Sequence, residues 1–250
     1  MAGKIDKYKV QAALVRSFFD AFSHGVIESQ VEDPKEKTTP QSVKKLMLEH
    51  YEHIAPAFFD IMFFPLAAMN YKYEDSAALA REAQQRGDDM MALVRTACGD
   101  EAYYNAMVEE YKRNFSMLLA GRYLSNADHL EGYVRKAEEE TEASVDSDRA
   151  IELTVRVVMF AYVRGLRQTG EGARFDRSVH LRQVHPLRGA TLFRLMLDAM
   201  NILLLDEAVD FADAEAADLA SLFLKVCQTQ HNFTVMTDEM DRTYSELMKE

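Results

Sequence analysis

Apolar residues recur at spacings of three and four along nearly the whole chain, and this periodicity constrains the fold more than any other feature. Such spacing places apolar side chains on one face of an α-helix, whereas strands need a period-two alternation that never persists here. Only ten glycines and five prolines interrupt the 250 residues. We therefore expect an all-α, antiparallel helical bundle without strands, formed by one domain over residues 1–250, and we find no internal repeat of fixed period. The pattern predicts about nine helices, at 5–29, 41–70, 74–97, 101–123, 126–142, 147–168, 187–206, 213–229 and 231–248.

Several helix ends have a chemical explanation. Gly99 can end one helix and Asp100 can cap the next, because glycine tolerates the left-handed conformation and aspartate accepts hydrogen bonds from free backbone N–H groups. Asp146 or Ser147 can cap a later helix in the same way. Thr39 can likewise cap a helix that begins at Pro40, because the N–H group that proline lacks is not needed in the first helical turn.

The chain is acidic, with a formal net charge of −12 and a pI near 5.1. This charge repels phosphate backbones and anionic lipids, so nucleic acids and membrane surfaces are disfavoured as partners. Cys98 and Cys227 lie far apart in apolar helical patterns, and the first residues contain no apolar leader segment. Both features fit a reducing cytosol, and we expect a cytoplasmic protein.

The apolar run from 54 to 69 is interpreted as a core helix rather than a membrane segment. It is shorter than the roughly 18 residues that a membrane span needs, and it contains Pro56 and Pro65. Its only charge is Asp60, which we expect to be buried and paired with a cation or a backbone donor, because an isolated buried charge is strongly destabilising. A catalytic carboxylate is the alternative.

The longest expected loop, 169–184, is locally basic in this acidic chain. Six arginines in the loop and its flanks outnumber the two acidic residues, Glu171 and Asp176. Either ion pairs with the protein's own acidic helices hold this loop, or it binds an anionic ligand or acidic partner. The arginines are Arg164, Arg167, Arg174, Arg177, Arg182 and Arg188.

A cluster of metal-ligating residue types lies near the start of the second expected helix, at Glu49, His50, Glu52 and His53. Helical spacing turns these side chains toward a common side, and helical bundles build di-iron sites from similar pairs. The other histidines supply no matching second pair, so a solvated polar face is the competing interpretation. A metalloenzyme with this site remains an alternative function.

Other enzyme classes find little support in the residue patterns. The acidic stretches at 88–89 and 206–213 have carboxylates of the kind that hold Mg²⁺, but their spacing is incomplete. Glycine-rich phosphate loops, nucleophile elbows and zinc motifs do not occur in the sequence. We expect a protein that is not an enzyme and that needs no cofactor.

Two short stretches in the last third of the chain carry a family resemblance. The first is His185-Pro186-Leu187-Arg188, followed by Ile202-Leu203 and Glu207-Ala208, and the second is 231–237, His-Asn-Phe-Thr-Val-Met-Thr. In this order they resemble the closing helices of the 14-3-3 proteins. The first two thirds of the chain match that family poorly.

The resemblance implies an acidic, dimeric, nine-helix adaptor that binds an extended, phosphorylated segment of a partner in a concave groove. Asn232 matches an asparagine that binds the peptide backbone, Arg194 takes the place of a second one, and Met236 replaces a tryptophan that covers the peptide. Arg113 or Arg122 would supply phosphate contacts on the fifth helix. The third helix offers acids and a histidine where the family has cations. A non-catalytic helical subunit of a larger assembly fits the same features.

Overall fold

The structure is a computed structural model that describes residues 3–30, 44–45, 48–71, 78–79, 81, 89–120, 144–167, 186–205 and 219–247. Helices make up almost all of this part of the chain, so the all-α class is confirmed. Eight helices lie in the described part, and the helix expected at 126–142 falls outside it. The helices are α1 (Lys7–Gln30), α3 (Tyr51–Asn70), α5 (Met90–Ala97), α6 (Glu101–Leu119), α8 (Ser147–Arg167), α10 (Pro186–Leu204), α11 (Leu219–Cys227) and α12 (Gln230–Leu247).

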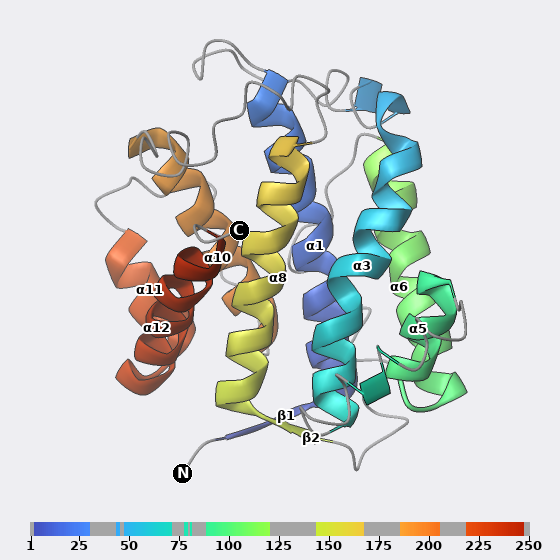
Figure 1. Cartoon of the computed structure of the whole chain (residues 1–250). Coiled ribbons are helices and arrows are strands. Elements are labelled where there is room, and N and C mark those ends of the chain that lie inside the picture. Colours follow the sequence, from blue (N-terminus) through green and yellow to red (C-terminus); the bar gives the residue numbers. More distant parts are fainter. Residues whose placement is uncertain are drawn as a thin grey trace.

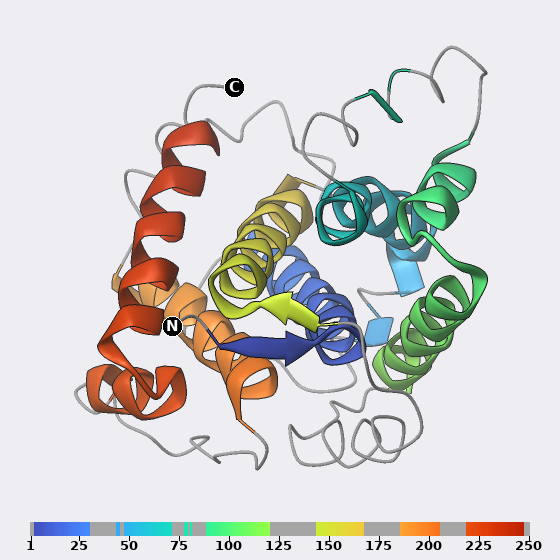
Figure 2. The ribbon, with the colours of Figure 1, turned by 90° about the horizontal axis from the view of Figure 1, so that it is seen from below.

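Two short strands correct the expectation that the chain has none. β1 (Lys4–Asp6) pairs in antiparallel fashion with β2 (Ser144–Asp146), and Ile5 lies opposite Val145 at the centre of the pair. Each strand has three residues, too few for a period-two pattern to show in the sequence. The sheet lies across the starts of α1 and α8 (Figure 2).

The two strands lead into the two central helices in the same way. In β1, Asp6 Oδ1 accepts hydrogen bonds from the backbone N–H groups of Tyr8 and Lys9, at 2.8 and 3.0 Å. In β2, Asp146 Oδ1 accepts from the N–H groups two and three residues later, at 3.1 and 3.4 Å. Asp146 therefore caps α8, as one of the two predicted candidates. Both helices run away from the sheet in one direction, so this central pair is parallel and not antiparallel as expected (Figure 1).

Helices α1 and α8 meet backbone to backbone at two glycines. A Cβ atom added at Gly25 would lie 2.2 Å from the carbonyl oxygen of Tyr162, and one at Gly165 would lie 2.2 Å from the carbonyl oxygen of Phe22. Real Cβ atoms do not approach backbone atoms this closely. Only glycine on both sides permits the crossing.

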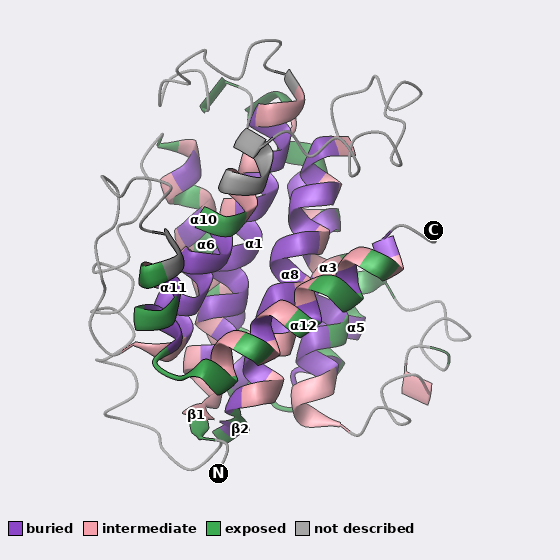
Figure 3. Cartoon of the chain, turned by 90° about the vertical axis from the view of Figure 1, so that its left-hand side faces the viewer, coloured by how far each residue is buried: buried purple, intermediate pink, exposed green. Residues whose placement is uncertain are grey.

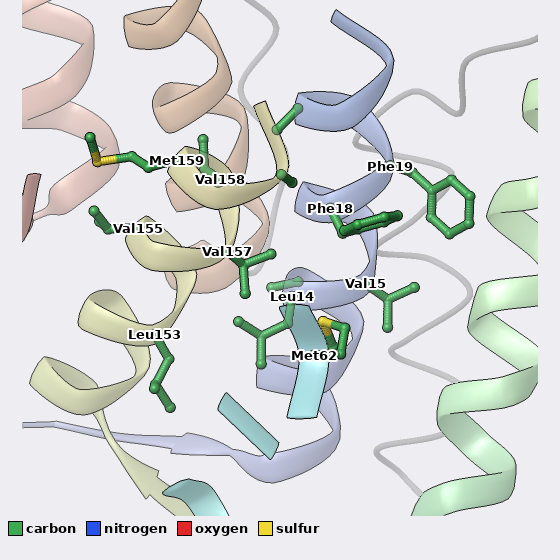
Figure 4. Close-up of a cluster of buried hydrophobic side chains, with 14 of the residues drawn as sticks. Leu14, Val15, Phe18, Phe19, Met62, Leu153, Val155, Val157, Val158 and Met159 are labelled. Atoms are coloured by element: carbon green, nitrogen blue, oxygen red, sulfur yellow. The ribbon is translucent and has the colours of Figure 1, made fainter. Parts of the chain in front are cut away.

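The core forms around this crossing. Leu14 and Phe18 of α1 are fully buried, and Val157 of α8 and Met62 of α3 lie near them (Figure 4). Phe18 packs edge-on against Phe58 of α3, with ring centroids 5.1 Å apart. Helix α1 also contacts α6 and α10, so it is surrounded by helices and contributes more to the core than any outer helix could.

The first element of the chain is repeated 140 residues later. Residues 4–27 and 144–167 both form a strand, an aspartate cap and a helix, with the crossing glycine at the same place in each. Asp6, Val15, Arg16, Ala21 and Gly25 recur as Asp146, Val155, Arg156, Ala161 and Gly165. The strand register and the reciprocal glycine contacts place a pseudo-two-fold axis between the two copies.

A second element repeats at a different interval, 129 residues. Helices α5 and α6 are joined by a turn with Gly99 at φ +80°, and α11 and α12 by a turn with Gln228 at φ 63°. Asp100 accepts a hydrogen bond from the N–H three residues later, and Thr229 does the same with its hydroxyl. Asp100 thus caps α6 as predicted. The shared residues are Leu93, Cys98, Met107, Glu110, Arg113, Ser116 and Leu118, which recur as Leu222, Cys227, Met236, Glu239, Arg242, Ser245 and Leu247.

The helix contacts obey the same symmetry. Helix α1 packs against α6 as α8 packs against α12, and α3 packs against α5 as α10 packs against α11. Each central helix also touches the opposite half, α1 through α10 and α8 through α3. The described helices therefore form two related halves. Their intervals of 140 and 129 residues agree with the absence of a repeat of fixed period, but the sequence analysis did not reveal the duplication itself.

Helix α3 differs from its prediction at its start, which is Tyr51 and not residue 41, and in the position of Asp60. It continues through Pro56 and Pro65, and Asp60 lies on its exposed face together with His53 and Phe64. The prediction of a buried, paired Asp60 is wrong, because residues at four-residue spacing in this apolar run share the face that points to solvent. Among the described residues α3 alone is long and apolar enough to cross a membrane, and 44% of its apolar window is buried in the protein.

Candidate functional site

Four of the five residues predicted to line one groove are described, and they lie on three different helices. Arg113 is on α6, Arg194 on α10, and Asn232 and Met236 on α12, while Arg122 lies outside the described residues. Helices α6 and α12 are on opposite sides of the molecule (Figures 1 and 2). A single ligand groove that includes both Arg113 and Asn232 is therefore not formed.

Two of these residues serve the fold. The amide Nδ2 of Asn232 donates to the backbone oxygen of Cys227 at 2.8 Å and so closes the turn between α11 and α12. Met236 is fully buried, with 0% exposure. Arg194 is exposed on α10. Asn232 and Met236 are thus occupied within the structure, whatever contacts Arg194 makes.

The cluster at 49–53 does not form a metal site. No group of three His, Cys, Asp or Glu side chains among the described residues could hold a metal ion. The rings of His50 and His53 are 6.3 Å apart between centroids. Burial, and next the charge of His53, lower the pKa of His50. Glu49, Glu52 and His53 are exposed, which fits the competing interpretation of a solvated polar face.

The remaining charged stretches lie largely outside the described residues. Asp89 is described, and its side chain accepts a hydrogen bond from the N–H of Ala92 at 2.8 Å as the cap of α5. Residue 88, the acidic stretch 206–213 and the basic loop 169–184 are not described. The proposed roles of those residues stay predictions.

The internal duplication reveals a different candidate, a pair of equivalent helix faces. Glu110, Arg113 and Ser116 follow one another at three-residue spacing on α6, and Glu239, Arg242 and Ser245 do so on α12. Each step of three residues turns about 60° around the helix axis, so each set runs from the glutamate on the inner side to the serine on the outer side. We call these two sets the Arg–Ser faces of α6 and α12.

The glutamate of the α12 face points inward. Glu239 is 1% exposed and accepts hydrogen bonds from Arg156 Nη1 at 3.2 Å and from the hydroxyl of Thr243 at 3.0 Å. Arg156 also binds Glu246 at 2.7 Å. Burial lowers the pKa of Arg156, but hydrogen bonds and charges from Glu246 and Glu239 outweigh it, so the pKa is raised overall. This network joins α12 to α8.

The α6 face has the same inward contact in weaker form. The carboxylate of Glu110, 13% exposed, accepts a hydrogen bond from Asn114 Nδ2 at 2.8 Å. Asn114 Oδ1 in turn accepts from Arg16 Nη1 at 3.5 Å. Arg16 is the counterpart of Arg156, so each half ties its outer helix to its central helix through an arginine at the equivalent position.

The arginine and serine of each face point outward. The side chains of Arg113 and Arg242 are 34% and 55% exposed, and Ser116 and Ser245 are exposed as well. The outer surface of α12 is visible in Figure 3. Each arginine forms an ion pair with the glutamate beneath it, at 3.7 Å for Arg113 and Glu110.

In each face, the ion pair with the glutamate holds the guanidinium of the arginine at the surface. A guanidinium has five N–H donors in a planar fork, and one carboxylate engages at most two of them. The arginine of each face and the serine hydroxyl one turn away are therefore groups that can donate hydrogen bonds to a carboxylate or a phosphate. Sequence reasoning selected Arg113 but missed its counterpart Arg242, although the Glu-x-x-Arg-x-x-Ser pattern is legible at both places.

Known proteins add no guidance to this geometry. Comparison of the chain with protein-family models, curated proteins and solved structures gives no match. Function is therefore inferred from the protein's own side chains.

Proposed function

We propose that the protein is a non-catalytic adaptor that binds an anionic segment of a partner protein through its Arg–Ser faces. The observation that carries this proposal is the presence of the same outward-facing arginine and serine in both halves. The adaptor function expected from the 14-3-3 resemblance points the same way, but it enters here with different contact residues. Homodimerisation and a cytoplasmic location remain predictions.

Packing explains the buried shared residues, and ion pairs with Glu110 and Glu239 hold the two arginines, but folding does not explain the exposed serines. Cys98, Met107 and Leu118 and their counterparts are buried, so packing restricts them. An exposed serine has no such constraint, since surface substitutions usually change the free energy of unfolding by less than about 0.5 kcal/mol. Two halves that have diverged at most positions, yet share an exposed arginine and serine, fit a common binding role.

The chemistry of the faces selects an anionic group. Arginine binds carboxylates and phosphates through charge-assisted hydrogen bonds, which are about twice as strong as neutral ones. The net charge of −12 repels anions at a distance, so binding depends on short-range contact and is not driven by long-range attraction. A phosphoserine or a glutamate in an extended partner segment supplies the required group.

A peptide library tests the proposal. The library contains extended peptides in matched triplets, with phosphoserine, glutamate or serine at the centre, and binding is measured by fluorescence anisotropy at low salt. We expect at least one anionic member to bind more tightly than its serine twin, and we expect added salt to weaken it. The double variant Arg113→Glu/Arg242→Glu should lose this binding.

The matched control places the same charge change elsewhere. Lys4 and Lys225 are exposed cations on β1 and α11 that have no cationic counterpart in the other half. Lys4→Glu/Lys225→Glu alters the net charge as the test variant does, and it should retain binding. If no anionic peptide outperforms its serine twin, or if both double variants lose affinity equally, the adaptor proposal is refuted.

A further inference from the structure

We infer that the chain has two separate binding sites, one on the Arg–Ser face of α6 and one on that of α12, and binds two anionic segments at once. This inference rests on the proposed adaptor function and adds its stoichiometry and its geometry. The structural basis is the pseudo-two-fold axis between α1 and α8, which relates the packing of α6 on α1 to that of α12 on α8.

The two faces belong to separate side-chain networks. The α6 face is joined to α1 through Glu110, Asn114 and Arg16. The α12 face is joined to α8 through Glu239 and Arg156. The helices lie on opposite sides of the molecule, so a short segment bound on one face does not contact the other (Figure 2). Sites without shared partners act independently in their energetics.

The surroundings make the two sites unequal. On α12 the guanidinium of Arg242 faces a second acid, Glu152 Oε1, at 3.3 Å, in addition to Glu239. At the position before the arginine, α6 carries the exposed cation Lys112 where α12 carries the exposed acid Asp241. An anionic segment meets more negative charge at α12, so the α6 site binds the same peptide more tightly.

Two sites on opposite sides define the class of partner. A single short segment occupies one site, and the second site then holds a second partner molecule. The protein would therefore bridge two copies of an anionic segment, and an oligomeric partner would gain avidity from the two attachments. A single chain would thus offer two binding sites, as a symmetric dimer of subunits with one site each would.

Isothermal titration calorimetry of the full chain measures the stoichiometry directly. The probe is the anionic peptide that binds most tightly in the library described above. We expect two molecules of peptide per chain, with a several-fold difference between the two dissociation constants. Arg113→Glu should leave one molecule per chain at the weaker constant, and Arg242→Glu should leave one at the tighter constant.

Controls separate a lost site from a lost fold. Lys4→Glu and Lys225→Glu should each retain two molecules per chain. Circular dichroism and the melting temperature show that each variant is folded, and Arg113→Gln and Arg242→Gln repeat the test without introducing a negative charge. A stoichiometry of one in the unaltered protein, abolished by a single variant, overturns the two-site inference but leaves the adaptor function intact. Absence of any peptide that binds refutes the adaptor function, and the inference with it.

Discussion

The glycine crossing of α1 and α8 allows a quantitative prediction. Gly25→Ala places a Cβ atom 2.2 Å from the carbonyl oxygen of Tyr162 and 2.8 Å from the backbone nitrogen of Leu166. Both are backbone atoms of a helix, so neither can move as a flexible side chain would. The two helices must separate by roughly 1 Å to restore ordinary contact, which loosens the core on both sides of the crossing.

The expected cost follows from two opposing terms. Overpacking of a tight core costs about 1–3 kcal/mol, and a clash with backbone belongs at the upper end or beyond. Alanine in place of glycine in a helix recovers about 1 kcal/mol of intrinsic propensity. We therefore expect Gly25→Ala to lower the free energy of unfolding by about 2 kcal/mol. By symmetry Gly165→Ala should cost about the same, because its Cβ would meet the equivalent carbonyl oxygen of Phe22.

The double variant tests whether both glycines serve one crossing. Once the helices have separated for the first alanine, the second meets a wider gap, so the combined loss should be smaller than the sum of the single losses. Urea unfolding followed by circular dichroism at 222 nm measures all three variants, with Gly3→Ala as control. A Cβ at Gly3 would make only an ordinary contact of 3.7 Å with Ser147 Oγ. If Gly25→Ala is as stable as the unaltered protein, or if the two losses add, close helix contact at this point is refuted.

Three further predictions concern single positions. Gly99→Ala should lower the free energy of unfolding by about 1 kcal/mol, because Gly99 has φ +80° at the end of α5, and equal urea midpoints would contradict this. Asp60→Ala should change it by less than about 0.5 kcal/mol, because the side chain is exposed; a loss of several kcal/mol in thermal unfolding would show a buried pair after all. Burial raises the pKa of Cys98 to about 12 and that of Cys227 to about 11 from an ordinary 9.0. Both thiols stay protonated in the folded protein while the unfolded chain loses these protons, so stability is full below about pH 9 and falls as the pH rises toward 12. In urea unfolding, the free energy of unfolding should fall less steeply with pH for Cys98→Ala than for the unaltered protein. An equal pH dependence of the two proteins would argue against the buried thiol as the cause.

Helix positions were predictable because their signals are local. The apolar period located α1, α8 and α12 to within two residues, and Asp100 caps α6 as its side-chain chemistry indicates. The exposed position of Asp60 was not predictable from the run itself, since an apolar stretch does not show which of its faces meets a neighbour. That depends on the packing of α3 against α5 and α8.

The duplication was hidden by divergence and by its changing interval. Asp6 and Asp146 are 140 residues apart, whereas Cys98 and Cys227 are 129 apart, so no single period aligns both elements. Some of the shared residues are those that geometry demands, such as the crossing glycines and the cap aspartates, and the shared set is too small to be conspicuous in the sequence. The Arg–Ser faces became recognisable only when the second interval was known from the turns at Gly99 and Gln228.

The pairing of the two halves at the axis can be tested by disulfide formation. Ile5 and Val145 lie directly opposite each other at the centre of the sheet. Ser144 lies opposite Asp6, so Lys4 and Ser144 are offset by two residues along the strands. Opposite residues in an antiparallel pair have Cα atoms about 4.5–5.5 Å apart, within reach of a disulfide, but a diagonal shift of two residues exceeds the limit of about 7 Å. Cys98 and Cys227 are buried and should not interfere.

Mild oxidation of Ile5→Cys/Val145→Cys should therefore give an intramolecular disulfide, seen as faster migration in non-reducing electrophoresis. Lys4→Cys/Ser144→Cys should give none under the same conditions. That pair of results supports two equivalent halves joined at a two-fold axis between Ile5 and Val145. Cross-linking of the second variant, or failure of the first in a folded protein, would contradict the arrangement on which the paired Arg–Ser faces depend.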